Sequence, residues 1–194
     1  MKGEVIVNPG DLPTCLMCLL SGKVKIFKNG ISGRRQILRV IKPVEYFGYR
    51  AFFANQNFAS TATSLESSSV CEIPLDLIYK YLETNAPLGL FFIKDLSLSL
   101  GFSDERTVNL TQKHVRGRLA ESLLFLKDNY GLEEDEATLS IYLSREDLAN
   151  LSNMTTANAI RTLAQFAAER IIAIDGKKIK IINEEELKKT SKIG

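Results

Sequence analysis

The chain lacks the features that mark secreted proteins, membrane-spanning proteins and proteins that bind nucleic acid over their whole surface. Its 194 residues carry 25 Lys and Arg against 23 Asp and Glu, a formal net charge of +2, so contact with nucleic acid would need a local basic patch. No apolar run approaches the ~20 residues that span a bilayer, and no signal peptide opens the sequence. We therefore expect a soluble, cytoplasmic protein without a membrane partner.

Cysteine and histidine are scarce, which limits metal and redox chemistry. The cysteines are Cys15, Cys18 and Cys71, an odd number that does not indicate a disulfide framework. Cys15 and Cys18 form a Cys-x-x-Cys pattern inside a run typical of a buried strand, where residues three apart point to opposite faces. A zinc or iron–sulfur site would need further ligands, and His114 is the single histidine. We expect no metal site.

The first part of the chain is rich in short apolar runs separated by turn residues. Many short strands with Gly and Pro between them are typical of an antiparallel sandwich or jelly roll. The expected strands are residues 4–7, 15–20, 23–29, 35–41, 58–64 and 70–73. A short helix is expected at 75–82. Basic side chains in this part indicate either a solvated sheet face or a site for an anionic ligand: Arg34, Arg35, Arg39, Lys42 and Arg50.

A long helical segment is expected from Pro87 to about Lys127, with Gly101 as the place where it could lose regularity. A helix of ~40 residues spans about 60 Å, more than a small domain can cover. Its apolar stripe therefore needs a partner, and a second copy of the same helix is the simplest one. Asn129 or Gly131 is suited to end the helix.

The most informative stretch, residues 143–172, indicates two helices joined by a tight turn. Ser144 begins a capping-box pattern, so the first helix should begin at Arg145. Asn153 tolerates positive φ in the turn, and Thr155 can cap the second helix. The expected buried residues are Leu148, Ala149, Leu151, Ala159, Leu163, Phe166 and Ala167. This pattern fits either a plain helical hairpin or a helix-turn-helix, whose second helix enters the major groove of DNA.

Two alternating strands around an Asp-Gly turn follow within residues 171–182, which is a strong hairpin signal. A hairpin directly after a recognition helix is a wing, and Lys177, Lys178 and Lys180 are placed where a wing could touch phosphates. This addition favours a winged helix-turn-helix over a plain hairpin. The acidic stretch 132–136 is expected to be a flexible connector, and residues 184–189 a short helix or a frayed tail.

With these parts in this order, the chain resembles the CRP/FNR family of bacterial transcription regulators over nearly its whole length. The segments that carry the resemblance are LSREDLANLSNMT, Arg161-Thr162-Leu163, the wing around Asp175-Gly176-Lys177, residues 115–124 and residues 20–25. The resemblance implies an α+β fold in three parts. These are a cyclic-nucleotide-binding-like antiparallel β-roll (jelly roll) at 1–85, a dimerisation helix and hinge at 86–131, and a winged helix-turn-helix DNA-binding domain at 132–194.

The family resemblance also implies a function. Members bind pseudo-palindromic double-stranded DNA as homodimers and recruit or block RNA polymerase, usually under the control of a small effector. The sequence itself names no cofactor or effector, and a constitutive member without an effector is the alternative. Iron–sulfur members carry a cysteine cluster in an N-terminal extension that this sequence does not show. A haem-binding or other gas-sensing member would have His114 as its obvious ligand.

The effector region departs from the family pattern. Cyclic-nucleotide binders carry Phe-Gly-Glu, whose carboxylate accepts from the ribose hydroxyl, and further on an Arg-Ser or Arg-Thr whose arginine pairs with the cyclic phosphate. Here the first motif is Phe47-Gly48-Tyr49 and the second is Ala59-Ser60. Both key groups are missing, so cyclic AMP is not expected as the effector. The candidate pocket residues that remain are Phe47, Gly48, Tyr49, Arg50, Ser60 and Thr61.

The recognition helix departs from the family pattern as well. Relatives often carry Arg-Glu or a nearby Glu at Thr156 and Ala157, and a small polar residue at Ile160, so only Arg161 keeps its type. Arginine can pair bidentately with guanine, which is worth about 1–3 kcal/mol of discrimination. The expected base contacts are Thr156, Asn158, Ile160 and Arg161. The expected phosphate contacts are Ser144, Arg145, Thr155, Lys177 and Lys178.

A jelly-roll enzyme of the cupin type is the competing hypothesis from another class. Such enzymes hold a metal with two or three histidines plus a carboxylate on the barrel strands. The single histidine, His114, lies outside the strand region, and no Ser-His or Cys-His pair can form in the roll. We therefore expect a protein that is not an enzyme and has no catalytic residues.

Overall fold

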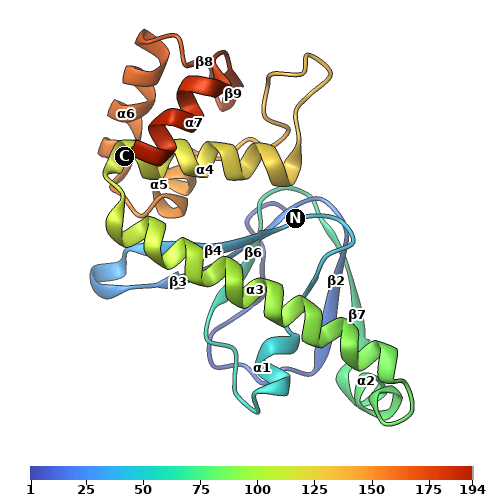
Figure 1. Ribbon diagram of the computed structural model, residues 1–194. Helices are drawn as coiled ribbons and strands as arrows, with labels where there is room; N and C mark the ends of the chain where they lie inside the picture. The colour runs from blue at the N-terminus through green and yellow to red at the C-terminus, as the bar shows by residue number, and fades with distance from the viewer. Residues whose placement is uncertain (194) are drawn as a thin grey trace. The chain divides into compact units, whose positions relative to one another are not determined.

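The structure is a computed structural model that describes residues 1–193 (Figure 1). The chain forms two compact units, Met1–Ser103 and Asp104–Gly194. The first unit combines antiparallel strands with helices and the second is mostly helical, so the predicted α+β class is confirmed. No helix in the described part of the chain is long and apolar enough to cross a membrane.

Two antiparallel sheets build the first unit. The first sheet has the order β1-β6-β3-β4 and the second the order β5-β2-β7. Their bounds are β1 Val5–Val7, β2 Cys15–Ser21, β3 Val24–Asn29, β4 Arg35–Ile41, β5 Tyr46–Phe47, β6 Thr61–Ser64 and β7 Ser69–Pro74. All six predicted strands are present. The short β5 and the helix after it, α1 (Tyr49–Phe53), were not predicted, because neither is long enough to show a period.

Alternate residues of β2 face two different cores. Met17 and Leu19 pack into a cluster to which both sheets contribute, including Val24 of β3 and Ile41 of β4. Leu16 points to the other face, where it packs with the helices α1, α2 (Leu75–Leu82) and the beginning of α3. The predicted bounds of α2 are confirmed. The strand period thus sorts the side chains of one central strand between two apolar clusters.

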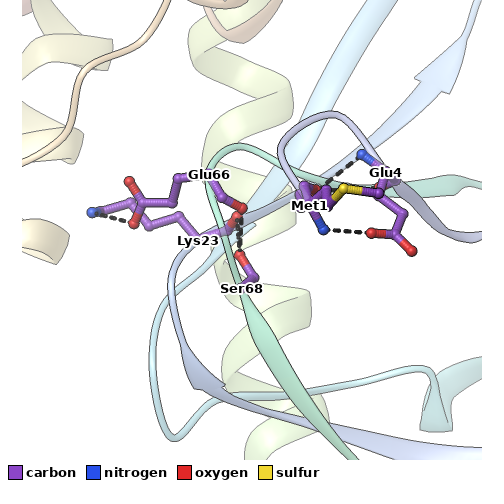
Figure 2. A network of polar contacts seen from close by, with 6 residues as sticks. Met1, Glu4, Lys23, Glu66 and Ser68 are labelled. Atoms are coloured by element: carbon purple, nitrogen blue, oxygen red, sulfur yellow. Dashed lines mark hydrogen bonds and ion pairs between the residues drawn. The ribbon is translucent and has the colours of Figure 1, made fainter.

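The turn between β2 and β3 is held by a small polar network (Figure 2). Gly22 adopts φ 85°, and a Cβ there would collide with Ser68. The Ser68 hydroxyl donates to the carbonyl oxygens of Glu66, at 2.9 Å, and Lys23, at 3.3 Å. The Lys23 Nζ lies 3.0 Å from Glu66 Oε1. Glycine is needed at this turn because the neighbouring loop closes directly against it.

The segment predicted as one helix from Pro87 to Lys127 is two helices, so that prediction was wrong. They are α3 (Ala86–Gln112) and α4 (Val115–Tyr130), and Gly101 lies inside α3 without interrupting it. The chain is extended at His114, with φ −67° and ψ 163°. The apolar period continues on both sides of the break, so the sequence pattern does not show it.

A side chain of α4 supports the break between α3 and α4. The Arg118 guanidinium donates to the carbonyl oxygens of Leu110, at 3.2 Å, and Lys113, at 3.5 Å. These carbonyls lie at the end of α3, where a helix leaves them without intrahelical partners. The far end of α4 is closed by Gly131, with φ 74°, which is one of the two predicted caps.

The second unit packs its remaining helices on α4. They are α5 (Arg145–Leu151), α6 (Thr156–Ala168) and α7 (Glu184–Ile193), with the hairpin β8 (Ile172–Asp175) and β9 (Lys178–Ile181) between α6 and α7. The core side chains that are at most 2% exposed include Leu119, Leu123, Leu126, Leu148, Leu151, Leu163, Phe166 and Leu187. The final segment is therefore a packed helix, one of its two predicted forms.

The acidic stretch 132–136 is a folded loop, so the prediction of a flexible connector was wrong. The Asp135 carboxylate accepts from the backbone of Ala137 and from the backbone and hydroxyl of Thr138, at 2.8–3.1 Å. The bonds from Thr138, and then that from Ala137, hold the pKa of Asp135 well below its usual range. The loop also runs along β9, where the Leu139 N–H donates to the Ile179 carbonyl at 2.9 Å.

Replacing Asp135 with Asn is expected to lower the free energy of unfolding at pH 7, because a neutral amide cannot accept these bonds as a carboxylate does. The depressed pKa stabilises the fold fully above the unfolded value of about 3.9, and this contribution is lost as the pH falls toward the folded value. Urea unfolding should show that the difference in the free energy of unfolding between D135N and wild type narrows below about pH 4.

Glu134→Gln is the matched control, because Glu134 is exposed on the same loop and its carboxylate makes no ion pair within the described residues. This variant should unfold like wild type at both pH values. If D135N and E134Q had the same stability at pH 7, the carboxylate would not hold the loop.

Candidate nucleic-acid interface

The first helix of the predicted helix-turn-helix begins as expected. The Ser144 Oγ accepts from the Asp147 N–H at 3.0 Å and donates to Asp147 Oδ2 at 2.7 Å, so α5 begins at Arg145. In the turn, Asn153 adopts φ 50°. The buried Ser152 hydroxyl donates to Ser122 Oγ of α4 at 2.8 Å. This bond fixes the turn to the helix beneath it.

The second helix, α6, has one buried face and one open face. Thr155 caps it by accepting from the Asn158 N–H at 3.2 Å. The predicted inner residues Ala159, Leu163 and Phe166 are at most 1% exposed, and Ala167 is only half-buried. The open face begins with a group of polar and small side chains. They are the exposed Thr156, Ala157, Ile160 and Arg161 and the half-buried Asn158.

Two of the expected base contacts touch each other. The Arg161 guanidinium donates to Asn158 Oδ1, one turn earlier on α6. The Ile160 side chain beside them is 51% exposed and adds an apolar surface to this face. The structure therefore brings all four expected base contacts together on one solvent-facing surface of α6.

The wing forms as the sequence predicts. Asp175 and Lys178 are paired at the end of the hairpin, and its loop is Gly176 and Lys177, with Gly176 at φ 54°. The Arg145 Nη2 donates to the Gly176 carbonyl at 2.7 Å. This contact directs Arg145 toward the wing and links the beginning of α5 to the tip of the hairpin.

The expected phosphate contacts differ in what they already bind. Lys177 is exposed at the tip and makes no ion pair with any residue among 1–193. Lys178 lies 3.3 Å from Glu133 Oε2, with its Nζ 5.3 Å from the centre of the Tyr142 ring. Ser144 and Thr155 serve as helix caps.

The sequence analysis missed the pairing of the wing with the acidic loop. The opposite charges of the two segments are the signal that could have found it.

Two arginines that the sequence analysis also missed hold the helices of this surface. Arg116 of α4 makes a two-pronged ion pair with Glu169 at the end of α6, with 2.9 Å between Nη1 and Oε1. Its guanidinium lies 4.7 Å from the centre of the Phe166 ring. The hydrogen bonds that Arg116 donates to Glu169 raise the pKa of Arg116 and lower the pKa of Glu169. α6 is therefore anchored at its C-terminal end.

A second anchor acts on α5. Arg106, in the last part of α3, donates to the Leu151 carbonyl at 3.0 Å, where α5 ends. Burial lowers the pKa of Arg106 to about 10, so its guanidinium stays charged at neutral pH. Positive charge at a helix C-terminus is favourable, because the last carbonyls carry partial negative charge.

The expected effector residues are divided between core and surface. Phe47 belongs to the core between the sheets, and Thr61 is buried in β6. Tyr49, 3% exposed, donates from its hydroxyl to Asp95 of α3. Gly48 has φ 97°, and a Cβ there would lie 2.8 Å from the Met17 Cε. Ser60 is half-buried, and Arg50 is exposed on α1.

Metal ligands do not gather anywhere among residues 1–193: no group of three or more His, Cys, Asp or Glu side chains is placed to hold an ion. His114 is exposed and precedes α4.

Comparisons with known proteins agree with this geometry. Residues 1–85 match the cyclic nucleotide-binding domain, and residues 117–190 match the Crp-like helix-turn-helix domain. The chain is 25% identical over 187 residues to a CRP-like cAMP-activated global transcriptional regulator of Mycobacterium tuberculosis, covering 96% of this chain and 84% of that protein. It is 28% identical over 189 residues to the fumarate and nitrate reduction regulatory protein of Vibrio cholerae, covering 96% and 74%.

Solved structures show the same fold. FixK2 from Bradyrhizobium japonicum superposes with a TM-score of 0.88 at 19% identity, over 97% of this chain and 93% of that one. A CRP-family transcriptional regulator from Thermus thermophilus gives 0.82 at 20% identity, over 98% and 94%. The two matched domains occur together here as in these transcription regulators, and none of these relatives is a jelly-roll enzyme. The chain belongs to the CRP/FNR family of DNA-binding transcription regulators and is not an enzyme.

Proposed function

We propose that this chain acts as a homodimer on a pseudo-palindromic DNA site and controls transcription through RNA polymerase, without cyclic AMP as its effector. The observation that carries the proposal is the open face of α6, where four candidate base contacts lie together on a helix anchored at its end. Within this proposal, residues 1–85 form the roll, 86–131 the dimerisation helix and hinge, and 132–194 the DNA-binding domain. Because its partner is double-stranded DNA, the protein acts in the cytoplasm.

The chemistry of the α6 face defines what it can recognise. Arg161 presents a planar fork of donors that fits guanine O6 and N7, and its bond to Asn158 holds that fork in place. Ile160 offers an exposed apolar surface to a thymine methyl group. Thr156 lies at the N-terminal end of the helix, where a short hydroxyl side chain can approach a base edge or a phosphate.

The phosphate contacts orient the domain without carrying sequence information. Lys177 is free to bind a phosphate directly, whereas Lys178 must exchange the Glu133 carboxylate for one. Ser144, Arg145 and Thr155 lie at the beginnings of α5 and α6, where backbone N–H groups and the helix dipole favour an anion.

The homodimer is supported by apolar side chains of α3 that remain largely exposed within the first unit. Six of them are between 39% and 65% exposed: Leu90, Phe91, Ile93, Leu98, Leu100 and Phe102. Exposed apolar surface of this extent marks an interaction site. A second copy of α3 across a two-fold axis would cover it and would present two recognition helices to half-sites about 34 Å apart.

The effector region supports control without cyclic AMP. In this chain a buried tyrosine replaces the carboxylate that accepts from the ribose, and its hydroxyl donates to Asp95 instead. One candidate is control by another small molecule that acts as the effector. An effector-independent protein is the second candidate, and the bond from Tyr49 to Asp95 favours it because two side chains of the chain itself join α1 to α3.

Replacing Arg161 with Ala should reduce the preference for the wild-type site over a site with one changed guanine by about 1–3 kcal/mol. The site is first selected from random duplexes with the wild-type protein, and binding is then measured by fluorescence anisotropy at several salt concentrations. A variant that kept the full wild-type discrimination would show that α6 does not contact bases through this residue.

Lys177→Gln is the matched control for that experiment, because it removes a charge outside α6. It should weaken binding to all duplexes alike and reduce the slope of log affinity against log salt by about 1.

Ile93→Glu and Leu98→Glu should each convert the dimer toward monomer, because an unpaired buried carboxylate costs more than ~1.4 kcal/mol, about tenfold in the dissociation constant. Sedimentation equilibrium measures the change, and circular dichroism confirms folding. Leu77→Glu is the matched control, since Leu77 is 44% exposed on α2 rather than on α3. If all three variants associated like wild type, α3 would not be the dimer helix.

Saturating cyclic AMP should leave the melting temperature unchanged. A true ligand at ~100 times its dissociation constant would instead add about 2.7 kcal/mol to the free energy of unfolding and so raise the melting temperature. Tyr49→Phe should lower the free energy of unfolding by roughly 1.5–3 kcal/mol through loss of one partly buried hydrogen bond to a carboxylate, and the exposed Tyr81→Phe should not. A melting temperature raised by cyclic AMP would contradict this part of the proposal. Site-specific binding by protein purified free of ligands would support the effector-independent candidate.

A further inference from the structure

Cys18 and Cys71 lie directly opposite each other in the antiparallel strands β2 and β7. The backbone of Leu19 bonds to the other side of β2: its N–H donates to Glu45 at 3.1 Å and its carbonyl accepts from Val44 at 2.8 Å. The N–H and carbonyl of Cys18 therefore point toward β7. Such a hydrogen-bonded pair has its Cα atoms about 5.5 Å apart, within the span of a disulfide.

The two thiols share one face of the sheet. Directly opposite residues project to the same side, so Cys18 and Cys71 lie on the side of Leu16 and Ile73. Cys18 is 8% exposed, whereas Cys71 is half-buried in an edge strand. Cys71 is therefore the more accessible residue of the pair, and both are free thiols in this structure.

We propose that Cys18 and Cys71 form a reversible modification site whose substrate is a peroxide. The Cys71 thiolate attacks the peroxide oxygen, breaks the O–O bond and becomes a sulfenic acid, while the leaving oxygen takes a proton. The Cys18 sulfur then attacks the Cys71 sulfur, a disulfide forms and water leaves. In sum, two thiols lose two electrons and two protons, and one hydrogen peroxide becomes two waters.

Cys15, the third cysteine, lies outside this site. It belongs to the opposite face of β2, where it packs against the core between the sheets. Burial, and then the charge of Glu72, raises the pKa of Cys15, so less of its thiol is in the reactive thiolate form. It therefore provides a matched control on the same strand.

Closing the bond would move neighbouring groups. Opposite Cβ atoms in a sheet lie ~5 Å apart, and a disulfide needs about 3.8 Å, so β2 and β7 must shift toward each other. Cys18 is also opposite Tyr46 of β5, whose ring lies 5.7 Å from that of Phe91 on α3. The shift would thus reach α3, whose role as the dimer helix rests on the function proposed above. A bond strained in this way is also easily reduced, which makes the modification reversible.

The test oxidises the reduced full-length chain with hydrogen peroxide, blocks the remaining thiols with N-ethylmaleimide, and maps the tryptic peptides by mass spectrometry. Wild type and Cys15→Ala should both give a cross-link between peptides 3–23 and 51–80, and dithiothreitol should remove it. Cys18→Ala and Cys71→Ala should give none. If the buried Cys18→Ala does not fold, the half-exposed Cys71→Ala carries the comparison. A cross-link absent from the folded wild type, or lost in Cys15→Ala, overturns the site.

Amide hydrogen exchange on the same samples tests the link to α3. Oxidation should speed exchange in the segment around Phe91 several-fold in wild type and Cys15→Ala, but not in Cys71→Ala. An unchanged rate in the cross-linked protein overturns the coupling. Neither readout requires DNA or a dimer, so failure of this site and failure of the proposed function are distinguishable.

Discussion

The burial of one face of α6 against α4 is the constraint on which the DNA-binding surface depends. Phe166 is fully buried, and Arg116 of α4 lies over its ring while pairing with Glu169. A rotation of α6 about its axis would both expose Phe166 and break the ion pair between Arg116 and Glu169. The outward residues are therefore fixed by the inward ones: with Phe166 inside, a helical period of 3.6 places Ile160 and Arg161 in solvent.

Local chemistry made much of the second unit predictable from the sequence. Ser144 and Thr155 cap their helices because a short side-chain oxygen meets a free N–H three residues on. Asn153 and Gly176 take positive φ where the chain reverses. Each of these signals depends on neighbours within a few residues, and such signals remain readable without knowledge of the fold.

The missed features depend on contacts between distant residues. The break at His114 is supported by Arg118, which is placed to reach the end of α3 only once the chain has turned. The acidic loop was predicted to be a flexible connector because its charges are clustered, yet Asp135 organises the loop and pairs with Lys180 at 3.1 Å. In the roll, the family resemblance implies that Tyr49 stands where cyclic-nucleotide binders carry a carboxylate, and only the fold shows that its hydroxyl meets Asp95.

The contacts between the acidic loop and the wing have a consequence for the entropy of DNA binding. A lysine side chain that is ordered on binding loses about 1.5–2 kcal/mol of rotamer freedom. Lys178 and Lys180 are already held by Glu133 and Asp135, so part of this loss occurs when the domain folds. In the DNA complex proposed above, the wing would meet DNA with these two side chains already ordered. Lys178 and Lys180 would then exchange one oxygen partner for another with little further ordering.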